Sequence, residues 1–106
     1  MNDFKWSPAE KNLSRRAFEK ALESELSEVL AEFKAKAAAA GTPEEMWNVQ
    51  RFLASKEREI EEKYDYRYSR LILVFARLLR EGRIQEDQLA GLSEEKLTFI
   101  RSIASL

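Results

Sequence analysis

Apolar residues recur every three or four positions along most of this chain, which is the spacing of one face of an α-helix. In the first part of the chain the charged residues lie mostly outside this apolar stripe. The stripe consists of Phe18, Leu22, Leu26, Val29, Leu30, Phe33, Ala37 and Ala40. The pattern therefore predicts a first long helix over residues 8–40. Its start is marked by Ser7-Pro8-Ala9-Glu10, which supplies a cap, a proline at the first helical position and a Glu two positions after it.

A second stretch, from Thr42 to Gly82, repeats this start signal and contains no helix breaker in its interior. Thr42 is a cap residue, Pro43 occupies the first helical position and Glu45 completes the capping box. Gly82 supplies a residue that readily ends a helix. We therefore predict a second helix over residues 43–81. The joint between the two helices is so short that they are expected to form an antiparallel hairpin.

The second predicted helix changes character along its length. Residues 56–63 are charged at every position except Ile60, whereas residues 71–79 are almost entirely apolar. A helix that is apolar on all sides is normally buried on all sides. Residues 83–106 contain a short helical turn and a last helix capped by Ser93, and these are expected to cover residues 71–79. Residues 64–69 also resemble a strand in composition, but the helix-forming residues on both sides favour a helix.

The length of the second helix bears on assembly. A helix over residues 43–81 would be about 55–60 Å long, whereas a compact domain of this size is about 35 Å across. Such a helix must protrude, kink or lie against another copy of itself. We therefore predict one all-α domain over residues 1–106. It would be a long antiparallel helical hairpin with a small C-terminal helical head at residues 71–106, assembled as an elongated homodimer.

Composition narrows the possible functions. The chain has 18 basic and 19 acidic residues, and their interleaving disfavours binding to nucleic acid. It has no cysteine and no histidine, so thiol chemistry and the commonest general base and metal ligand are missing. The carboxylates alternate with Lys and Arg as on a solvated helix, which disfavours a catalytic pair. No membrane span or signal peptide is expected, which suggests a cytoplasmic setting. These observations favour an interaction protein without a cofactor over an enzyme.

One window is specific enough to indicate a family. Its residues are Trp47, Phe52-Leu53, Lys56, Glu59-Ile60, Lys63-Tyr64-Asp65, Arg67, Ser69, Val74-Phe75-Ala76, Leu78-Leu79 and Glu81-Gly82. In this order and spacing it resembles the fluorescence recovery protein family of cyanobacteria. The resemblance extends from Trp6-Ser7 to Leu92, and Lys63-Tyr64-Asp65 with Phe75-Ala76 are its strongest part.

The resemblance implies a non-enzymatic, all-helical antiparallel homodimer that needs no cofactor. Such proteins bind the photoactivated orange carotenoid protein, chiefly through its C-terminal domain, and accelerate its return to the resting form. This ends non-photochemical quenching at the phycobilisome, so a cytoplasmic protein is expected, peripheral to the thylakoid membrane through its partners. The residues that the resemblance assigns to partner binding or the dimer interface are Trp47, Lys63, Tyr64, Asp65, Arg67 and Phe75. Packing in the dimer or the head is the alternative role for all six, and for Trp47 and Phe75 it is the favoured one. For Trp6, at the start of the chain, packing as a staple or core residue is likewise favoured over a partner contact.

Five positions depart from the family pattern: Gln50, Arg51, Glu57, Leu73 and Phe99. Gln50 stands where the family has a His, and the other four leave the carry-over of function in doubt. Arg51 and Glu57 stand where the family has an acidic and a basic residue, so the two charges are exchanged. One interpretation is a compensated exchange that keeps an ion pair across the dimer. The other is a diverged member with a different partner. Leu73 and Phe99 replace a Phe and a Lys of the partner-binding head. A purely structural helical dimer is a further alternative.

Overall fold

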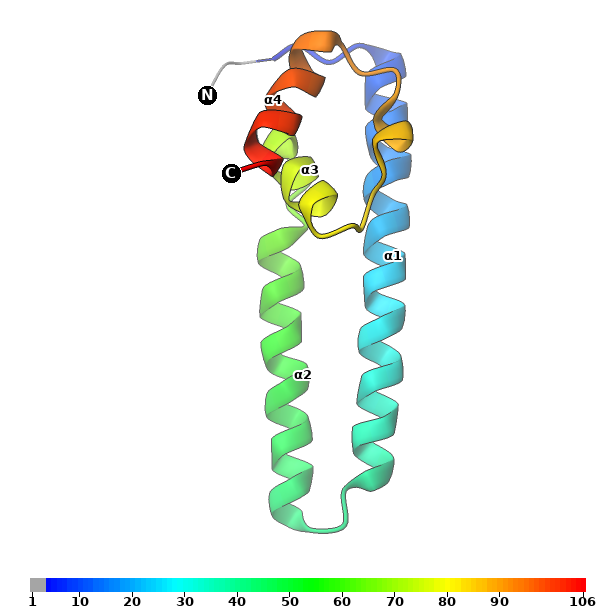
Figure 1. Cartoon of the computed structure of the whole chain (residues 1–106). Coiled ribbons are helices and arrows are strands. Elements are labelled where there is room, and N and C mark those ends of the chain that lie inside the picture. The colour runs from blue at the N-terminus through cyan, green and yellow to red at the C-terminus, as the bar shows by residue number, and fades with distance from the viewer. Residues whose placement is uncertain (1–3) are drawn as a thin grey trace. The chain divides into compact units, whose positions relative to one another are not determined.

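The computed structural model describes residues 4–106, and the regular elements in this range are helices (Figure 1). The predicted all-α class is confirmed. The elements are α1 (Pro8–Ala39), α2 (Pro43–Lys63), α3 (Leu71–Arg80), the 3-10 helix η1 (Glu86–Leu89) and α4 (Glu94–Ala104).

The chain divides into two compact units. We call residues 23–63 the hairpin unit, and the described residues before and after it, 4–22 and 64–106, the core unit. The helix α1 contributes to both units. The expectation of one domain stays a prediction.

The helix starts follow the predicted caps. The backbone N–H of Glu10 donates to Ser7 Oγ over 3.1 Å, and the N–H of Ser7 donates to Glu10 Oε1 over 3.0 Å. This is a reciprocal capping box. Thr42 Oγ1 accepts from the N–H of Glu45 at the start of α2, and Ser93 Oγ accepts from the N–H of Lys96 at the start of α4. Each cap satisfies a backbone donor that the first turn leaves without a partner.

The predicted continuous helix over residues 43–81 is wrong. α2 ends at Lys63, α3 begins at Leu71, and residues 64–70 form neither helix nor strand. The rings of Tyr64 and Tyr66 both pack edge-on against Phe18 of α1, with centroids 5.4 and 4.8 Å away. On a helix, two residues separated by one position point about 200° apart. An unbroken helix would therefore direct only one of these two tyrosines at Phe18.

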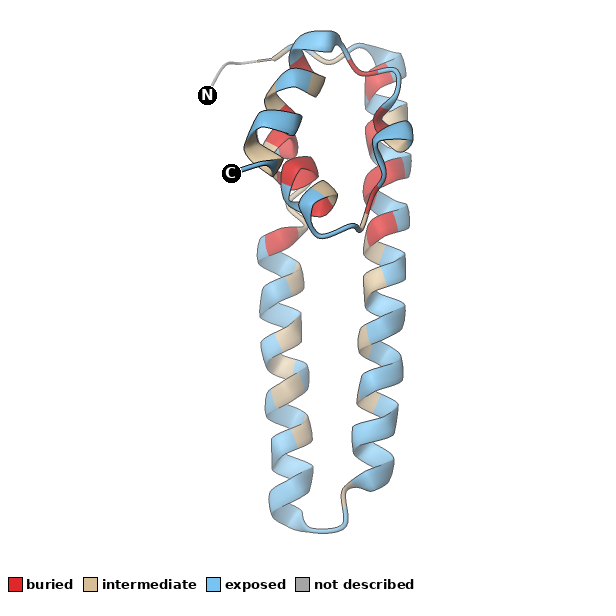
Figure 2. Cartoon of the chain, in the orientation of Figure 1, coloured by how far each residue is buried: buried red, intermediate tan, exposed pale blue. Residues whose placement is uncertain are grey.

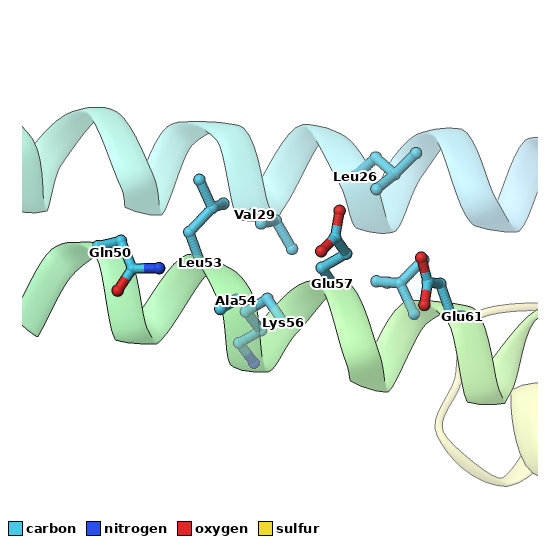
Figure 3. A pocket seen from close by; sticks show the side chains of 9 residues that line it. Leu26, Val29, Gln50, Leu53, Ala54, Lys56, Glu57 and Glu61 are labelled. Atoms are coloured by element: carbon cyan, nitrogen blue, oxygen red, sulfur yellow. The ribbon is translucent and has the colours of Figure 1, made fainter.

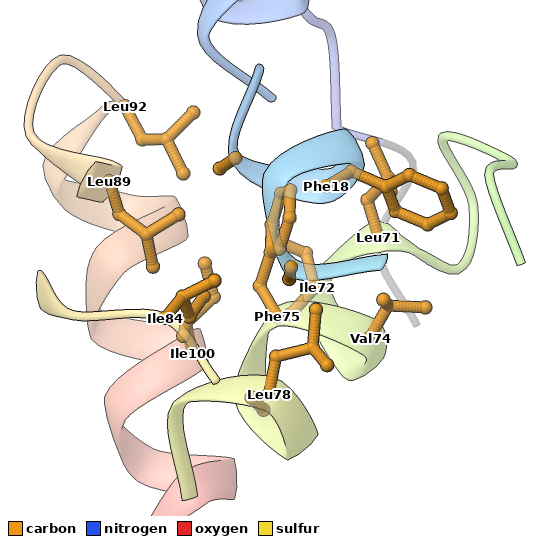
Figure 4. Packing of buried hydrophobic residues seen from close by; sticks show 13 residues of the cluster. Phe18, Leu71, Ile72, Val74, Phe75, Leu78, Ile84, Leu89, Leu92 and Ile100 are labelled. Atoms are coloured by element: carbon orange, nitrogen blue, oxygen red, sulfur yellow. The ribbon is translucent and has the colours of Figure 1, made fainter. Parts of the chain in front are cut away.

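The core unit contains the buried apolar residues of the described chain (Figures 2 and 4). α3 packs against α4, and Leu71, Phe75 and Leu78 are fully buried, as predicted for the almost entirely apolar segment. Gly82 adopts a positive φ of 74° and turns the chain after α3, so the predicted helix end is confirmed. Trp6 is half-buried and packs against this core.

A buried ion pair joins the first and last helices of the core unit. Lys96 Nζ lies 3.2 and 3.1 Å from the two carboxylate oxygens of Glu10, and it also donates to the backbone carbonyl of Lys5. Glu10 also accepts from the N–H of Ser93 over 2.9 Å. Burial by itself raises the pKa of Glu10, but the N–H groups of Ser7 and Ser93 and the Lys96 ammonium outweigh it and hold that pKa below its ordinary value.

The hairpin unit is organised differently. Residues 23–39 of α1 and the whole of α2 run antiparallel on either side of the Ala40–Thr42 joint (Figure 1), which confirms the predicted hairpin. Of its residues only Lys63 is buried, and no apolar side chain of this unit is. The unit therefore lacks an apolar core of its own.

Candidate functional site

Large apolar side chains are exposed mainly in the hairpin unit. Five of the seven in the described chain belong to it: Leu26, Leu30, Met46, Trp47 and Leu53. We call these five the exposed apolar set. Trp47 is 54% exposed and Leu30 is 51% exposed. Scattered apolar residues are normal on a protein surface, but a concentration in one small unit marks a contact surface.

Part of this set lines a groove of about 560 Å³ between α1 and α2 (Figure 3). Leu26 and Val29 line it from α1, and Leu53, Ala54 and Ile60 line it from α2. Leu53 and Glu57 project from α2 toward α1 in Figure 3. The remaining polar residues at the groove are Gln50, Lys56 and Glu61.

A second hollow of about 320 Å³ lies nearer the helical joint. It is lined by Phe33, Ala37, Ala40, Met46, Val49, Gln50 and Leu53, so it shares Gln50 and Leu53 with the larger groove. The two hollows together form an apolar strip along the hairpin unit. Such a strip fits an apolar helix surface better than a small polar ligand.

Lys63 is the last residue of α2 and forms an ion pair within the hairpin unit. Its Nζ lies 2.7 Å from Glu25 Oε2, and the two side chains are only 6% and 14% exposed. A buried pair of this kind is costly to break from one side, because the remaining charge is left uncompensated. The Lys63 ammonium therefore contacts Glu25 of the same chain and is largely shielded from solvent.

The residues after Lys63 divide between two environments. Tyr64 packs against Phe18, whereas Asp65 accepts hydrogen bonds from Arg67 Nε over 2.9 and 3.1 Å. The hydrogen bond from Arg67 lowers the pKa of Asp65. The Arg67 side chain is 68% exposed, so its guanidinium remains accessible. Phe75 is fully buried in the core unit, which agrees with a packing role.

The departures from the family pattern have different surroundings within their own units. Arg51 is exposed on α2 and donates to Asn48 Oδ1 over 2.9 Å, whereas Glu57 lines the groove. Leu73 is half-buried on α3, and Phe99 of α4 packs edge-on against Phe4 at 5.4 Å.

The structure thus divides the sequence-predicted site residues into two sets. One set belongs to the hairpin unit: Trp47, Arg51, Glu57 and Lys63. The other belongs to the core unit: Tyr64, Asp65, Arg67, Leu73, Phe75 and Phe99.

Sequence reasoning assigned no contact role to four members of the exposed apolar set: Leu26, Leu30, Met46 and Leu53. Leu26 and Leu30 stand four residues apart and belong to the apolar stripe of the first helix, so the signal was present. Periodicity identifies a stripe that needs cover, but it does not tell whether the same chain supplies that cover. Here α1 and α2 leave Leu26 and Leu30 of this stripe exposed.

Within residues 4–106, no group of three or more metal-ligating side chains comes together. No described helix combines the length and the apolar character needed to cross a membrane.

Comparisons with known proteins match nearly the whole chain to one family. The family model described as photoprotection regulator fluorescence recovery protein matches residues 6–104. The Fluorescence recovery protein of Synechocystis sp. is 39% identical over 101 residues, which cover 95% of this chain and 93% of that protein. The structure of the Fremyella diplosiphon Fluorescence Recovery Protein superposes with a TM-score of 0.90 at 37% identity. The Synechocystis sp PCC 6803 structure gives 0.90 at 38%. Each match covers 96% of this chain and all of the other.

Proposed function

Because the chain belongs to the photoprotection regulator fluorescence recovery protein family, we propose that it binds the photoactivated orange carotenoid protein and accelerates its return to the resting form. This would end non-photochemical quenching at the phycobilisome. The observation that carries the proposal is the family match over residues 6–104, which leaves almost no part of the chain outside the family pattern. The protein would act by binding alone, with no cofactor and no covalent step.

The proposal includes a homodimer built on the hairpin unit. This unit has no apolar core of its own, because its large apolar side chains are exposed or half-buried, and several of them line the groove. Most helical stability in proteins comes from packing an apolar face. A second copy that lays its hairpin unit against the first would bury both apolar strips. Such a contact is isologous, because each copy presents the same surface to the other.

Partner contacts are proposed at the accessible members of the predicted set. Arg67 is the strongest candidate, because its guanidinium is exposed beside the non-helical segment 64–70. Asp65 holds this guanidinium in place through the hydrogen bonds described above. Tyr64 has a supporting role, since its ring packs against Phe18 in the core unit.

The test is the dark recovery of the photoactivated orange carotenoid protein, followed by its absorbance in the presence and absence of this protein. We expect faster recovery when this protein is added at less than one molecule per carotenoid protein, because a catalyst of conversion is released after each event. An unchanged recovery rate, with the added protein shown to be folded, would refute the proposed function. A folded dimer without this effect would favour a diverged member with another partner or a structural dimer.

A further inference from the structure

The exposed side of α1 within the core unit carries a concentration of positive charge. Its exposed charged residues between Pro8 and Leu22 are four cations and one carboxylate: Lys11, Arg15, Arg16, Lys20 and Glu19. We call the four cations the basic face. The other acidic residue of this segment, Glu10, is buried and paired with Lys96.

The basic face contrasts with the charge of the rest of the protein. By sequence, residues 23–63 hold ten acidic and six basic residues, a net charge of −4. The remaining residues hold nine acidic and twelve basic ones, a net charge of +3, although the whole chain has a net charge of −1. Four of the twelve basic residues lie on this one helical segment.

Contacts within the described chain compensate little of this charge. Arg15 Nη1 lies 3.8 Å from Glu19 Oε1, and its guanidinium stacks on the ring of Tyr66 at 3.8 Å. Lys11 Nζ lies 5.3 Å from the centre of the Tyr68 ring. Within residues 4–106, no carboxylate lies within ion-pair distance of Lys11, Arg16 or Lys20.

The basic face does not stabilise α1. Lys11 with Arg15, and Arg16 with Lys20, are like charges four residues apart, which is a destabilising pairing on a helix. Lys11 also lies near the N-terminal end of α1, where the helix dipole disfavours cations. The opposite side of this segment is buried through Ser14, Ala17, Phe18 and Ala21, so the helix cannot turn these charges inward.

Arg16 and Lys20 also line a shallow groove of about 400 Å³ between α1 and η1. The other lining residues are Leu13, Ala17, Asp87, Gln88 and Ala90. Asp87 is the one carboxylate of this lining, and no described cation lies within ion-pair distance of it. The groove therefore sets two cations and the Gln88 amide against one carboxylate, so its charged lining is positive on balance.

We propose that the basic face is a docking surface for an acidic segment of a protein partner, and that it steers that partner onto the core unit. This inference rests on the proposed function, and it names the charge of the surface that the photoactivated partner presents. A lipid surface fits less well, because the apolar side of this segment is buried and cannot enter a bilayer. Charges of this kind act mainly on the association rate and on its salt dependence.

The deciding experiment compares two double variants that lose the same charge from the same helix. Arg16→Gln with Lys20→Gln removes half of the basic face, whereas Lys34→Gln with Lys36→Gln removes two exposed cations from the hairpin unit. We expect the first variant to associate with the photoactivated orange carotenoid protein about tenfold more slowly at low salt, with little change in dissociation. The control should associate like the unmodified protein. The difference should vanish at about 1 M salt, where screening acts over about 3 Å.

A second probe separates this inference from the proposed function. Fluorescent poly-L-glutamate should bind the unmodified protein and the control, and it should bind the Arg16→Gln/Lys20→Gln variant several-fold more weakly. If the orange carotenoid protein does not bind at all, the proposed function fails while this arm still tests the basic face. Equal behaviour of both variants toward both probes would overturn the inference. So would face-dependent binding to phosphatidylglycerol vesicles without any effect on either acidic probe.

Discussion

The helices of the two units differ in how far they are buried. In the core unit, α3 has six buried residues out of ten, because it packs against α4 and shares one apolar cluster with Ala17, Phe18 and Ala21 of α1. In the hairpin unit, the twenty-one residues of α2 include one buried residue, and that residue is the paired Lys63. The core unit therefore obtains its stability within one chain, whereas the hairpin unit presents apolar surface that a single chain leaves uncovered.

This difference explains why similar substitutions should have different consequences in the two units. In the core unit a changed side chain meets packed neighbours, so its effect is on folding. In the hairpin unit the same change meets water in the single chain, so its effect is on assembly.

The largest effect is expected from Phe75→Glu. Phe75 is fully buried among apolar residues, and an unpaired charge there should lower the free energy of unfolding by more than about 4 kcal/mol. Leu71→Glu should act in the same way. Chemical denaturation followed by circular dichroism measures the loss. Unchanged stability in either variant would mean that α3 is not packed as described.

The buried pair of Glu10 and Lys96 should be nearly as important. Glu10→Ala leaves the Lys96 ammonium buried without its carboxylate, so we expect a loss of about 3–5 kcal/mol. The matched control is Glu86→Ala, which breaks the exposed pair with Arg101 and should cost no more than about 1 kcal/mol. Similar losses in the two variants would contradict the role of burial.

The same pair predicts a pH dependence. Because the pKa of Glu10 is lower in the folded protein than its ordinary value of 4.5, its stabilisation is complete above that value. It is lost as the pH falls below 4.5 through the folded-state pKa. Unfolding measured between pH 7 and pH 3 should therefore show a steeper decline for the unmodified protein than for Glu10→Ala.

In the hairpin unit, Leu53→Glu should weaken the proposed dimer while leaving the core unit folded. Leu53 is 39% exposed and lines the groove, so a charge there is solvated in the single chain but must be desolvated in the dimer. We expect the dimer dissociation constant to rise roughly ten- to a hundredfold, which corresponds to about 1.4–2.8 kcal/mol. Sedimentation equilibrium measures it. A dimer of unchanged affinity would place the interface elsewhere.

The exchanged charges at Arg51 and Glu57 predict a smaller effect. Six residues apart on one helix they do not face each other. In an antiparallel dimer, however, residue 51 of one copy can face residue 57 of the other if the two-fold axis passes near Ala54. Arg51→Glu would then set two pairs of like charges together and shift the protein toward monomer, by about 0–1 kcal/mol for each pair.

The rescue variant sharpens this test. Arg51→Glu combined with Glu57→Arg should restore the dimer in sedimentation at low salt, because each contact regains opposite charges. Failure of the rescue, or a single variant that stays fully dimeric, would favour the diverged-partner interpretation over the compensated exchange.

The smallest structural effect is expected from Arg67→Ala. The side chain is 68% exposed, so its removal should leave thermal unfolding within about 0.5 kcal/mol of the unmodified protein. If Arg67 contacts the partner, the dissociation constant for the photoactivated orange carotenoid protein should rise several-fold. Arg58→Ala, another exposed arginine, serves as the control. Equal affinities for both variants would remove Arg67 from the contact surface.

The sequence alone determined the features that depend on neighbouring residues. Ser7, Thr42 and Ser93 cap helices as predicted, because a cap needs only a side chain within three residues of the donor that it satisfies. The almost entirely apolar composition of residues 71–79 was sufficient to predict that this segment belongs to a core, and six of its residues are buried. The family was also recognisable, since its motif consists of residues in a fixed order and spacing.

The tertiary structure decided the features that depend on distant residues. The helix break at residues 64–70 arises because Tyr64 and Tyr66 both contact Phe18, which lies more than forty positions earlier and has no influence on local helix propensity. Glu10 was recognisable as part of a capping box, but its pairing with Lys96 joins residues 86 positions apart. The exposure of Leu26 and Leu53 likewise depended on how far the two helices cover one another. Periodicity identifies an apolar face, whereas only the packed structure shows whether the same chain buries it.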